Sequence, residues 1–326
     1  MLRVGILGAA GIAPAAIIRP ANRRSDVVIT AVASRSESAA SQYASTWSIE
    51  RAYGDYRALL ADPEVDLVYN ALPPSGHAEW SIAALEAGKD VLCEKPFAMN
   101  AKQARRMRAS ADETGRRLIE AFHDRYHPLS HELDVIKASG RLGDILSLEA
   151  NFLATNSYDP KSLRHDPALG GGALMDLGCY PVHWVRAFMG AEPTVTSAEA
   201  VLNPSGADMN MDASLLFPSG ATARVRCAMD YEGAMVNSLD IVGTRGTLHV
   251  DNPVFPSRGH YIREEVDGIV RELTVRGATS YDHQLDAIVA GLESGAPLLT
   301  EGEDSVANMT VIDGIYAAAG MSLDFD

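Results

Sequence analysis

Residues 2–13 read LRVGILGAAGIA, an apolar run followed at once by small residues. The run, Leu2 to Leu7, has the length of a β-strand, and the residues from Ala15 to Asn22 have the composition of a helix. Strand, small-residue turn and helix in this order are the context of a dinucleotide-binding fingerprint. There, Gly8 permits the tight turn, Ala10 lets the backbone approach a pyrophosphate, and Ala13 permits close packing of helix on strand. We predict a dinucleotide site, with a tight turn that holds no ligand as the alternative.

Gly11 and Ile12 complete this turn where the helix begins. A helix N-terminus offers amide donors and the positive end of a dipole, both of which attract phosphate. We therefore count Gly11 and Ile12 among the cofactor-binding residues.

A second apolar strand, Val27 to Ala33, ends in Ser34, Arg35 and Ser36. This strand end meets the adenosine ribose in a dinucleotide fold, where an acid is typical of NAD enzymes and an arginine accommodates the 2′-phosphate of NADP. Ser34 and Arg35 therefore favour NADP(H). In the alternative, Ser36 caps the next helix, Arg35 is solvated, and Glu37 contacts the ribose, so that NAD(H) is also possible.

A third strand, Val65 to Leu72, ends before Pro73, and helical spacing resumes after His77. Ligands bind at the carboxyl ends of the strands in an open α/β sheet, so Leu72, Pro73 and His77 are predicted cofactor contacts. A structural histidine at the start of a helix is the alternative for His77.

The next strand, Asp90 to Cys93, stops at Glu94-Lys95-Pro96. A lysine held at this sheet edge by a rigid strand and a proline is a candidate reactive group, and Glu94 and Lys95 would both border the cofactor. A solvated loop lysine is the alternative.

Two kinds of domain follow from the order of these elements. Alternating strands and helices up to Phe122 predict an α/β fold, with a doubly wound parallel Rossmann sheet that binds NAD(P) over residues 1–122. Residues 123–326 are predicted to form an α+β domain for substrate binding and oligomerisation, with a large, mainly antiparallel open sheet. The later strands expected there are Val195–Val201, Ala213–Phe217, Ala221–Met229, Asn237–Val242, Thr247–Val250 and Ile269–Val275.

Composition and charge limit the classes of protein to which the chain can belong. The chain has 326 residues, of which 47% are hydrophobic and 22% charged, and its net charge of −15 argues against a nucleic-acid partner. Cys93, Cys179 and Cys227 are odd in number and lack metal-ligand spacing, which favours reduced thiols in a cytoplasm and no metal. The N-terminus lacks the pattern of a signal peptide, and no apolar run reaches the roughly 18 residues of a membrane span. We expect a cytoplasmic protein without a membrane partner.

A second group of polar residues follows a glycine-rich stretch. Asp176, Tyr180 and His183 stand at i, i+4 and i+7, so a helix would carry all three on one face. Pro181 requires the helix to begin nearby or to kink. In a structural alternative, these residues are a helix cap, a half-buried aromatic and a core histidine.

Three motifs in one order are more specific than any one of them. The GILGAAGIA start, Glu94-Lys95-Pro96, and Gly170-Gly171-Gly172 followed by Asp176-Leu177-Gly178-Cys179-Tyr180 together resemble the glucose-fructose oxidoreductase / inositol dehydrogenase / rhizopine-catabolism (Gfo/Idh/MocA) family. The residues in these motifs are most similar to those of the dihydrodiol dehydrogenase and D-xylose dehydrogenase branch.

The resemblance implies a nicotinamide-dependent oxidoreductase that interconverts a secondary hydroxyl and a ketone on a sugar, cyclic polyol or related diol. Lys95 and Tyr180 would be the acid/base pair, and Asp176 would orient the substrate hydroxyl. The side chains of free Tyr and Lys have pKa values of about 10 and about 10.4. A neighbouring ammonium would have to lower the pKa of the tyrosine, and desolvation that of the lysine. Which of the two transfers the proton stays open. The resemblance also implies a homodimer or homotetramer through the C-terminal sheet.

The chain departs from that branch at His123 and Asp124, where methionine and an aromatic residue are typical. We hypothesise that His123 and Asp124 contact hydroxyls or a charged substituent of the substrate. His183 is also a predicted substrate contact. Arg164 matches the arginine before the glycine-rich loop, and its role could be in substrate binding, in phosphate binding or in structure.

Two other functions suit the same fold. One is a non-catalytic NAD(P)-binding sensor or regulator, against which the presence of Lys95, Asp176 and Tyr180 argues. The other is a cofactor-using glycosidase, which would usually carry an export signal. Fold alone does not choose among these functions.

Overall fold

The computed structural model describes residues 1–321 of the chain. Contacts divide the chain into two compact units, one formed by residues 1–122 and 281–306, and the other by residues 123–280 and the described residues from Ala307 on. The segment Tyr281–Val306 thus packs with the first unit, although it lies within the C-terminal range assigned from sequence. No helix in the described part of the chain combines the length and the apolar character that a membrane crossing requires.

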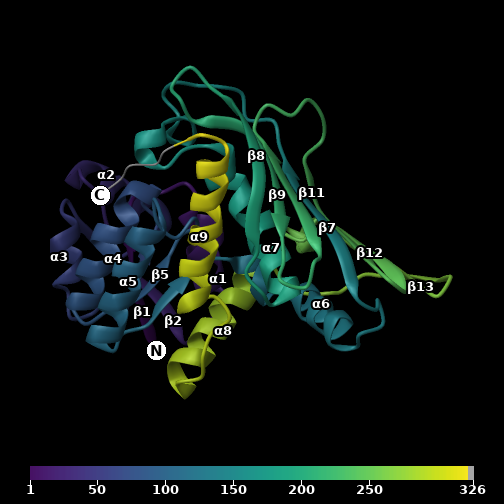
Figure 1. Ribbon diagram of the computed structural model, residues 1–326. Helices are drawn as coiled ribbons and strands as arrows, with labels where there is room; N and C mark the ends of the chain where they lie inside the picture. The colour runs from purple at the N-terminus through teal and green to yellow at the C-terminus, as the bar shows by residue number, and fades with distance from the viewer. Residues whose placement is uncertain (322–326) are drawn as a thin grey trace. The chain divides into compact units, whose positions relative to one another are not determined.

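The first unit contains a six-stranded sheet in the order β3-β2-β1-β4-β5-β6. Figure 1 labels three of its strands, β1, β2 and β5. Every neighbouring pair is parallel, which confirms the predicted Rossmann sheet. Its strands are β1 (Leu2–Leu7), β2 (Val27–Ala33), β3 (Arg51–Tyr53), β4 (Leu67–Asn70), β5 (Asp90–Cys93) and β6 (Leu118–Glu120).

Helices follow most strands of this sheet because each parallel strand needs a crossover. They are a π-helix (Pro14–Ile18) that continues into α1 (Arg19–Asn22), then α2 (Glu37–Trp47), α3 (Tyr56–Leu60), α4 (His77–Glu86) and α5 (Ala101–Thr114). Val4 and Ile6 of β1 lie in one buried cluster with Leu285 and Ile288 of α8 (Ser280–Ser294). Helix α8 therefore completes the core of the first unit.

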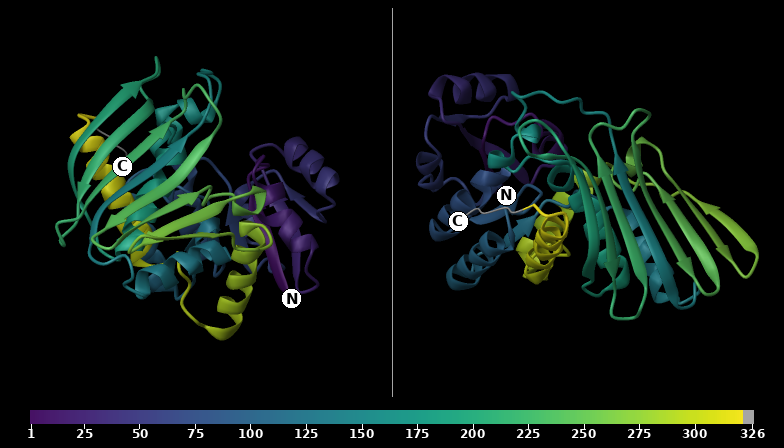
Figure 2. Two further views of the ribbon diagram at one scale, coloured as in Figure 1. Left: turned by 90° about the vertical axis from the view of Figure 1, so that its right-hand side faces the viewer. Right: turned by 45° about the horizontal axis from the view of Figure 1, so that its top comes forward.

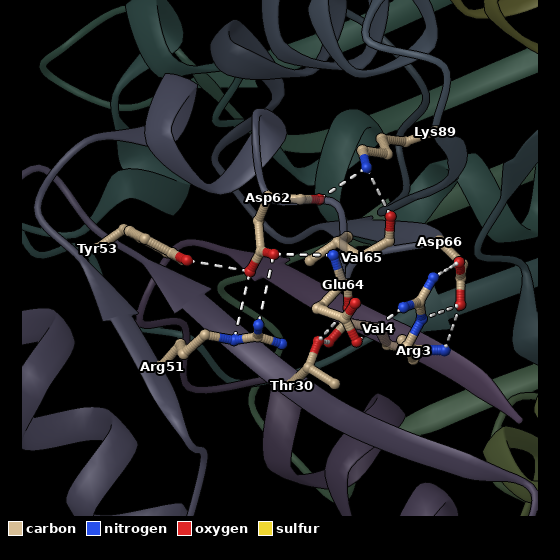
Figure 3. Close-up of polar contacts among 10 residues, drawn as sticks. All are labelled: Arg3, Val4, Thr30, Arg51, Tyr53, Asp62, Glu64, Val65, Asp66 and Lys89. Atoms are coloured by element: carbon tan, nitrogen blue, oxygen red, sulfur yellow. Dashed lines mark hydrogen bonds and ion pairs between the residues drawn. The ribbon is translucent and has the colours of Figure 1, made fainter.

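A polar cluster joins the amino ends of the strands, opposite the edge where ligands bind in such sheets (Figure 3). The buried Asp62 carboxylate accepts a 3.0 Å hydrogen bond from the Tyr53 hydroxyl and pairs with Arg51 at 3.3 Å. The ammonium of Lys89 donates to the carbonyl oxygens of Asp62 and Val65 at 2.8 and 2.7 Å. These bonds fix the loop that enters β4.

The second unit contains an eight-stranded sheet in the order β14-β13-β12-β11-β7-β10-β9-β8. Figure 2 shows its long strands side by side in one open sheet. The β7–β10 pair is parallel and the other pairs are antiparallel, so the prediction of a mainly antiparallel sheet is confirmed. Its strands are β7 (Ile145–Leu153), β8 (Thr194–Leu202), β9 (Asp208–Leu216), β10 (Thr222–Ala228), β11 (Val236–Gly243), β12 (Gly246–Asp251), β13 (Tyr261–Val266) and β14 (Ile269–Leu273).

The two faces of this sheet differ because side chains alternate along each strand. One face is apolar, with Val225 and Leu239 buried, and α7 (Cys179–Met189) packs against it (Figure 1). The other face is polar, and Arg224 on β10 pairs with Asp212 on β9 at 2.5 Å. Helix α6 (Pro128–Ala138) lies within the second unit, and α9 (Glu303–Ala318) begins in the first unit and continues in the second.

Candidate active site

In the first turn of the Rossmann unit, the backbone at Gly8 adopts a conformation that favours glycine, whereas Gly11 has space for a side chain. Gly8 has a φ of +97°, and its amide donates a 2.9 Å hydrogen bond to the carbonyl of Ala33. A Cβ added at Gly8 would lie 3.2 Å from Leu72 Cδ2 and 3.4 Å from the Ala71 carbonyl oxygen. This backbone conformation and these contacts bring the ends of β1, β2 and β4 close together.

The next residues leave backbone donors available. Within the described chain, the amides of Gly11 and Ile12 donate to no protein acceptor, and the π-helix that follows has no side-chain cap. Pro14 opens that helix and has no amide hydrogen. A Cβ at Gly11 would meet nothing within 4 Å, whereas Ala13 is fully buried. An open turn with unused amides suits the pyrophosphate of a dinucleotide.

Arg35 lies exposed just beyond the end of β2. Ser36 accepts a 3.4 Å hydrogen bond from the Ala39 amide and so caps α2, as the alternative interpretation expected. Both roles are compatible, because the cap uses Ser36 and leaves the exposed guanidinium of Arg35 accessible to a ligand. Ser34 is half-buried, and its amide donates to the carbonyl of Tyr53 at 3.0 Å.

His77 is fully buried between two strand ends. Its Nδ1 lies 2.9 Å from the carbonyl oxygen of Pro96, and its Nε2 lies 2.8 Å from that of Leu72. Burial lowers the pKa of His77 to about 4, although both carbonyls favour the charged ring. His77 therefore joins the loop after β4 to the loop after β5, as the structural alternative expected. Its contact with the cofactor stays a prediction, as does that of Pro73, which precedes the short 3-10 turn leading to α4.

Lys95 is half-buried at the carboxyl end of β5, beside a buried carboxylate. Glu94 Oε1 accepts a 2.5 Å hydrogen bond from the Tyr69 hydroxyl, and Glu94 Oε2 accepts a 3.2 Å hydrogen bond from the Lys95 amide. The Lys95–Pro96 peptide bond is cis. Glu94 thus links β4 to the backbone of the candidate reactive lysine.

The helix that carries Asp176, Tyr180 and His183 changes from π-helical to α-helical hydrogen bonding along its length. Leu174–Gly178 is π-helical and α7 begins at Cys179, so the helix expected to carry Asp176 and Tyr180 is a π segment followed by an α-helix. Pro181 has no amide hydrogen to donate to the carbonyl of Leu177, which explains why regular α-helical bonding is interrupted there. Such π segments are frequent at functional sites. Asp176 lies in the π segment.

The Asp176 carboxylate pairs with a guanidinium. Arg164 Nε donates a 2.8 Å hydrogen bond to Asp176 Oδ2. The side chain of Arg164 is 52% exposed and that of Asp176 is 21% exposed, so solutes can reach the pair. Arg164 therefore has a defined partner within the predicted substrate-binding set.

Tyr180, in α7, is buried and has a histidine as its polar partner. The Tyr180 hydroxyl lies 3.1 Å from His123 Nε2. His123 Nδ1 lies 2.7 Å from the Ser280 hydroxyl oxygen. The structure thus brings together Tyr180 and His123, two of the sequence candidates, and adds Ser280, which the sequence analysis did not identify.

His183, one turn further along α7, is buried near Asp124. Asp124 Oδ2 accepts a 2.8 Å hydrogen bond from Trp184 Nε1, and burial raises the pKa of Asp124. The burial of His183 suits a core position, and its contact with substrate stays a prediction.

A buried aspartate anchors the start of this helix. The Asp208 carboxylate accepts hydrogen bonds from the Leu174 amide at 2.7 Å and the Tyr316 hydroxyl at 2.9 Å. Gly172 has a φ of +135°, and a Cβ there would lie 2.1 Å from Asp208 Oδ1. The glycine-rich loop therefore lets Asp208 approach the backbone that leads to Asp176. No sequence signal marked Asp208 or Tyr316, because their partners lie far away along the chain.

The donor set of the first unit fits a dinucleotide. The turn after β1 offers unused amides and an open side at Gly11, and Arg35 adds an exposed cation at the end of β2. In the described residues, no group of three or more His, Cys, Asp or Glu side chains is arranged to hold a metal ion.

Comparison with known proteins identifies the class. Residues 2–122 match the oxidoreductase family with an NAD-binding Rossmann fold, and residues 132–249 match the GFO/IDH/MocA C-terminal domain. The chain is 36% identical over 327 residues to a D-xylose 1-dehydrogenase (NADP(+)) of Haloferax volcanii, with 99% of each chain covered. It is 31% identical to the trans-1,2-dihydrobenzene-1,2-diol dehydrogenase of Xenopus tropicalis, over 71% of this chain and 69% of that protein.

A solved structure shows the same fold over nearly the whole chain. It is an aldose-aldose oxidoreductase from Caulobacter crescentus complexed with glycerol, with a TM-score of 0.89 and 27% identity over 98% of this chain and 97% of that chain. The chain belongs to the Gfo/Idh/MocA oxidoreductase family, as its motifs indicated. It is a nicotinamide-dependent enzyme of the dehydrogenase and reductase type that acts on hydroxyl groups.

Proposed function

We propose that this enzyme interconverts a secondary hydroxyl and a ketone on a sugar, cyclic polyol or related diol, and that it uses NADP(H) in preference to NAD(H). The observation that carries the proposal is the Tyr180 hydroxyl, which is buried and yet 3.1 Å from an ionisable imidazole. A phenol in such a position is suited to exchange a proton with a substrate oxygen.

The first unit supplies the cofactor contacts. Gly8 and Ala10 shape the turn, the amides of Gly11 and Ile12 face the pyrophosphate, and Arg35 binds the 2′-phosphate. Glu94, Leu72 and Pro73 lie at strand ends where they would border the rest of the cofactor. When bound, the nicotinamide accepts or donates the hydride.

Residues of the chain transfer the proton and bind the substrate. Lys95 and Tyr180 form the acid/base pair, and a lysine ammonium near a phenol favours the phenolate. Asp176 accepts a hydrogen bond from a substrate hydroxyl, and Arg164 holds the Asp176 carboxylate in place through its 2.8 Å contact. His123 lies 3.1 Å from the Tyr180 hydroxyl, and His183 lies one turn further along α7.

The first experiment titrates NADPH and NADH into the wild-type protein and Arg35→Ala, with nicotinamide fluorescence as the readout. Loss of a hydrogen-bonded ion pair weakens NADPH binding by roughly tenfold to a hundredfold and leaves NADH binding unchanged. Arg105→Ala, at an exposed arginine on α5, is the matched control. Equal or tighter NADH binding in the wild type overturns the NADP preference and directs attention to Glu37.

The second experiment screens ketosugars and polyols with the preferred cofactor. Lys95→Ala and Tyr180→Phe abolish turnover and retain cofactor binding if these residues form the acid/base pair. Cofactor binding without turnover on any substrate in the wild type favours the non-catalytic sensor. Failure to bind either cofactor overturns the proposal as a whole.

We further propose that the chain forms a homodimer or homotetramer through the polar face of the large sheet. Leu216 and Val242 are exposed on that face and line a hollow of about 420 Å³ together with charged residues such as Arg224. Exposed apolar side chains on an open sheet are typical of surfaces that become covered. Sedimentation equilibrium of the wild type and Leu216→Glu tests this, and a monomer in both contradicts it. The cytoplasmic location stays a prediction.

A further inference from the structure

His123 contacts protein groups at both ring nitrogens. The Tyr180 hydroxyl lies 3.1 Å from Nε2, and the Ser280 hydroxyl oxygen lies 2.7 Å from Nδ1. The ring is 2% exposed and Ser280 is 3% exposed. Tyr180, His123 and Ser280 thus form a continuous chain of hydrogen-bonding groups inside the second unit.

Aromatic packing holds the imidazole in this position. The ring of Phe255 stacks on His123 with centroids 5.9 Å apart and planes at 27°. The Tyr180 ring approaches the imidazole at a steeper angle, with centroids 5.9 Å apart and planes at 66°. These contacts orient Nε2 toward the phenol.

The two hydrogen bonds of His123 depend on each other. A neutral imidazole has one N–H and one lone pair, so it donates at one nitrogen and accepts at the other. When a proton arrives at Nε2, the resulting imidazolium can donate its Nδ1–H to the Ser280 hydroxyl oxygen, which stabilises the charge. The phenol can therefore pass a proton to the imidazole while Ser280 holds the ring in place.

We propose that His123 is a positioning and proton-relay residue for Tyr180, oriented by Ser280. This inference rests on the proposed acid/base role of Tyr180. It assigns His123 to the proton path, rather than to the direct substrate contact expected from sequence.

In alcohol oxidation, a bound nicotinamide would take up the hydride when the substrate C–H bond breaks. The substrate O–H bond breaks at the same carbon centre, and its proton moves to the Tyr180 oxygen. The Tyr180 O–H bond breaks in turn, and a new N–H bond forms at His123 Nε2. The imidazole becomes an imidazolium, whose Nδ1–H donates to the Ser280 hydroxyl oxygen. After the ketone has left, the imidazolium gives up one proton to bulk water and the neutral ring is restored. Ketone reduction is the reverse.

Charged groups around the relay have other identified partners. Asp124, the next residue, accepts a hydrogen bond from Trp184 Nε1 and lies near His183. Arg258 lies 4.5 Å from the centre of the Phe255 ring, on which His123 also stacks.

The first test does not depend on turnover. Tyrosine labelled with ¹³C at Cζ reports the ionisation of each phenol by NMR, and Tyr180→Phe assigns the Tyr180 signal. We expect this signal to shift as the pH passes through the range where imidazoles titrate, and we expect His123→Gln to remove that shift. Ser280→Ala displaces the shift along the pH axis, because it removes the partner of Nδ1. His131→Gln, at an exposed histidine on α6, leaves it unchanged.

The second test uses kinetics with the preferred cofactor. Glutamine at position 123 keeps a hydrogen-bonding group but cannot take up a proton, so His123→Gln lowers kcat for alcohol oxidation by about 100-fold. It also removes the limb of the pH profile that belongs to imidazole, and it leaves the Kd of the cofactor within about twofold. A solvent deuterium effect on kcat falls in the same variant.

The outcomes separate this inference from the proposed function. If Tyr180→Phe is inactive while His123→Gln keeps the wild-type rate, pH profile and NMR shift, the relay is wrong and the role of Tyr180 stands. If Tyr180→Phe retains full activity, the proposed acid/base pair is wrong. If His123→Gln fails to fold, the Ser280→Ala variant decides, because a wild-type NMR titration and pH profile there contradict the relay.

Discussion

The hydroxyl of Tyr69 in β4 donates a 2.5 Å hydrogen bond to the carboxylate of Glu94, the residue before Lys95. Both side chains are buried. Burial and the nearby carboxylate keep the pKa of Tyr69 well above its usual value, so the phenol remains a donor throughout the neutral range. A buried bond between neighbouring strands thus supports the backbone of the candidate reactive lysine.

Tyr69→Phe removes this bond and leaves a buried carboxylate oxygen without its donor. We expect a loss of about 1–3 kcal/mol in the free energy of unfolding, measured with urea, and a lower kcat. Tyr53→Phe is the matched control, because it removes a 3.0 Å bond to Asp62 at the amino ends of the strands. It should reduce stability and leave kcat unchanged. Equal effects of both variants on kcat would contradict a local role for Tyr69.

His77 makes the protein sensitive to acid. Burial lowers its pKa to about 4 from 6.5. Because the folded chain binds this proton less readily than the unfolded chain, the free energy of unfolding falls as the pH drops from about 6.5 to about 4. The full effect amounts to about 3 kcal/mol. Urea titrations across this window should show a shallower pH dependence in His77→Gln and an unchanged one in His131→Gln. An equally steep curve in His77→Gln would refute the assignment.

Asp208 makes the free energy of unfolding fall as the pH rises, the opposite of the effect of His77. Burial raises its pKa to about 6 from 3.8. The folded chain therefore holds this proton more tightly than the unfolded chain, and the contribution of Asp208 to stability declines as the pH rises from about 4 to about 6. We expect the stability difference between wild type and Asp208→Asn to shrink over this window. Amide hydrogen exchange at Leu174 should be faster in the variant, since its 2.7 Å acceptor is altered. Unchanged exchange at Leu174 would show that Asp208 does not anchor the helix.

The two glycines of the first turn should respond differently to alanine. Gly8→Ala places a Cβ at a φ of +97° and 3.2 Å from Leu72 Cδ2, so it destabilises the fold by about 1 kcal/mol or more. Gly11→Ala places a Cβ in open space, so the melting temperature stays within a degree or two of the wild type. If the pyrophosphate lies against this turn, NADPH binding still weakens in Gly11→Ala. Wild-type affinity in that variant would remove Gly11 from the cofactor site.

Strands with strong apolar patterns were predictable, and short or polar strands were not. Leu2–Leu7, Val27–Ala33 and Asp90–Cys93 have the predicted bounds. β3 (Arg51–Tyr53) and β13 (Tyr261–Val266) were missed. β3 is too short to show a period, and β13 places charged residues in a strand that its neighbours β12 and β14 hold by backbone pairing. Pairing of this kind overrides a weak local preference.

The sequence by itself determined the Rossmann turn, the sheet edge that carries Lys95, and the helix that carries Tyr180, because these depend on local rules of strand length, glycine geometry and proline. Only the tertiary structure decided which side chains meet. Tyr69 reaches Glu94, Asp208 reaches Leu174, and His123 lies between Tyr180 and Ser280 across 57 and 157 positions of chain. A hydrogen bond requires its two atoms to lie within about 3 Å, and residues so far apart in sequence reach that distance only when strand pairing and core packing place them.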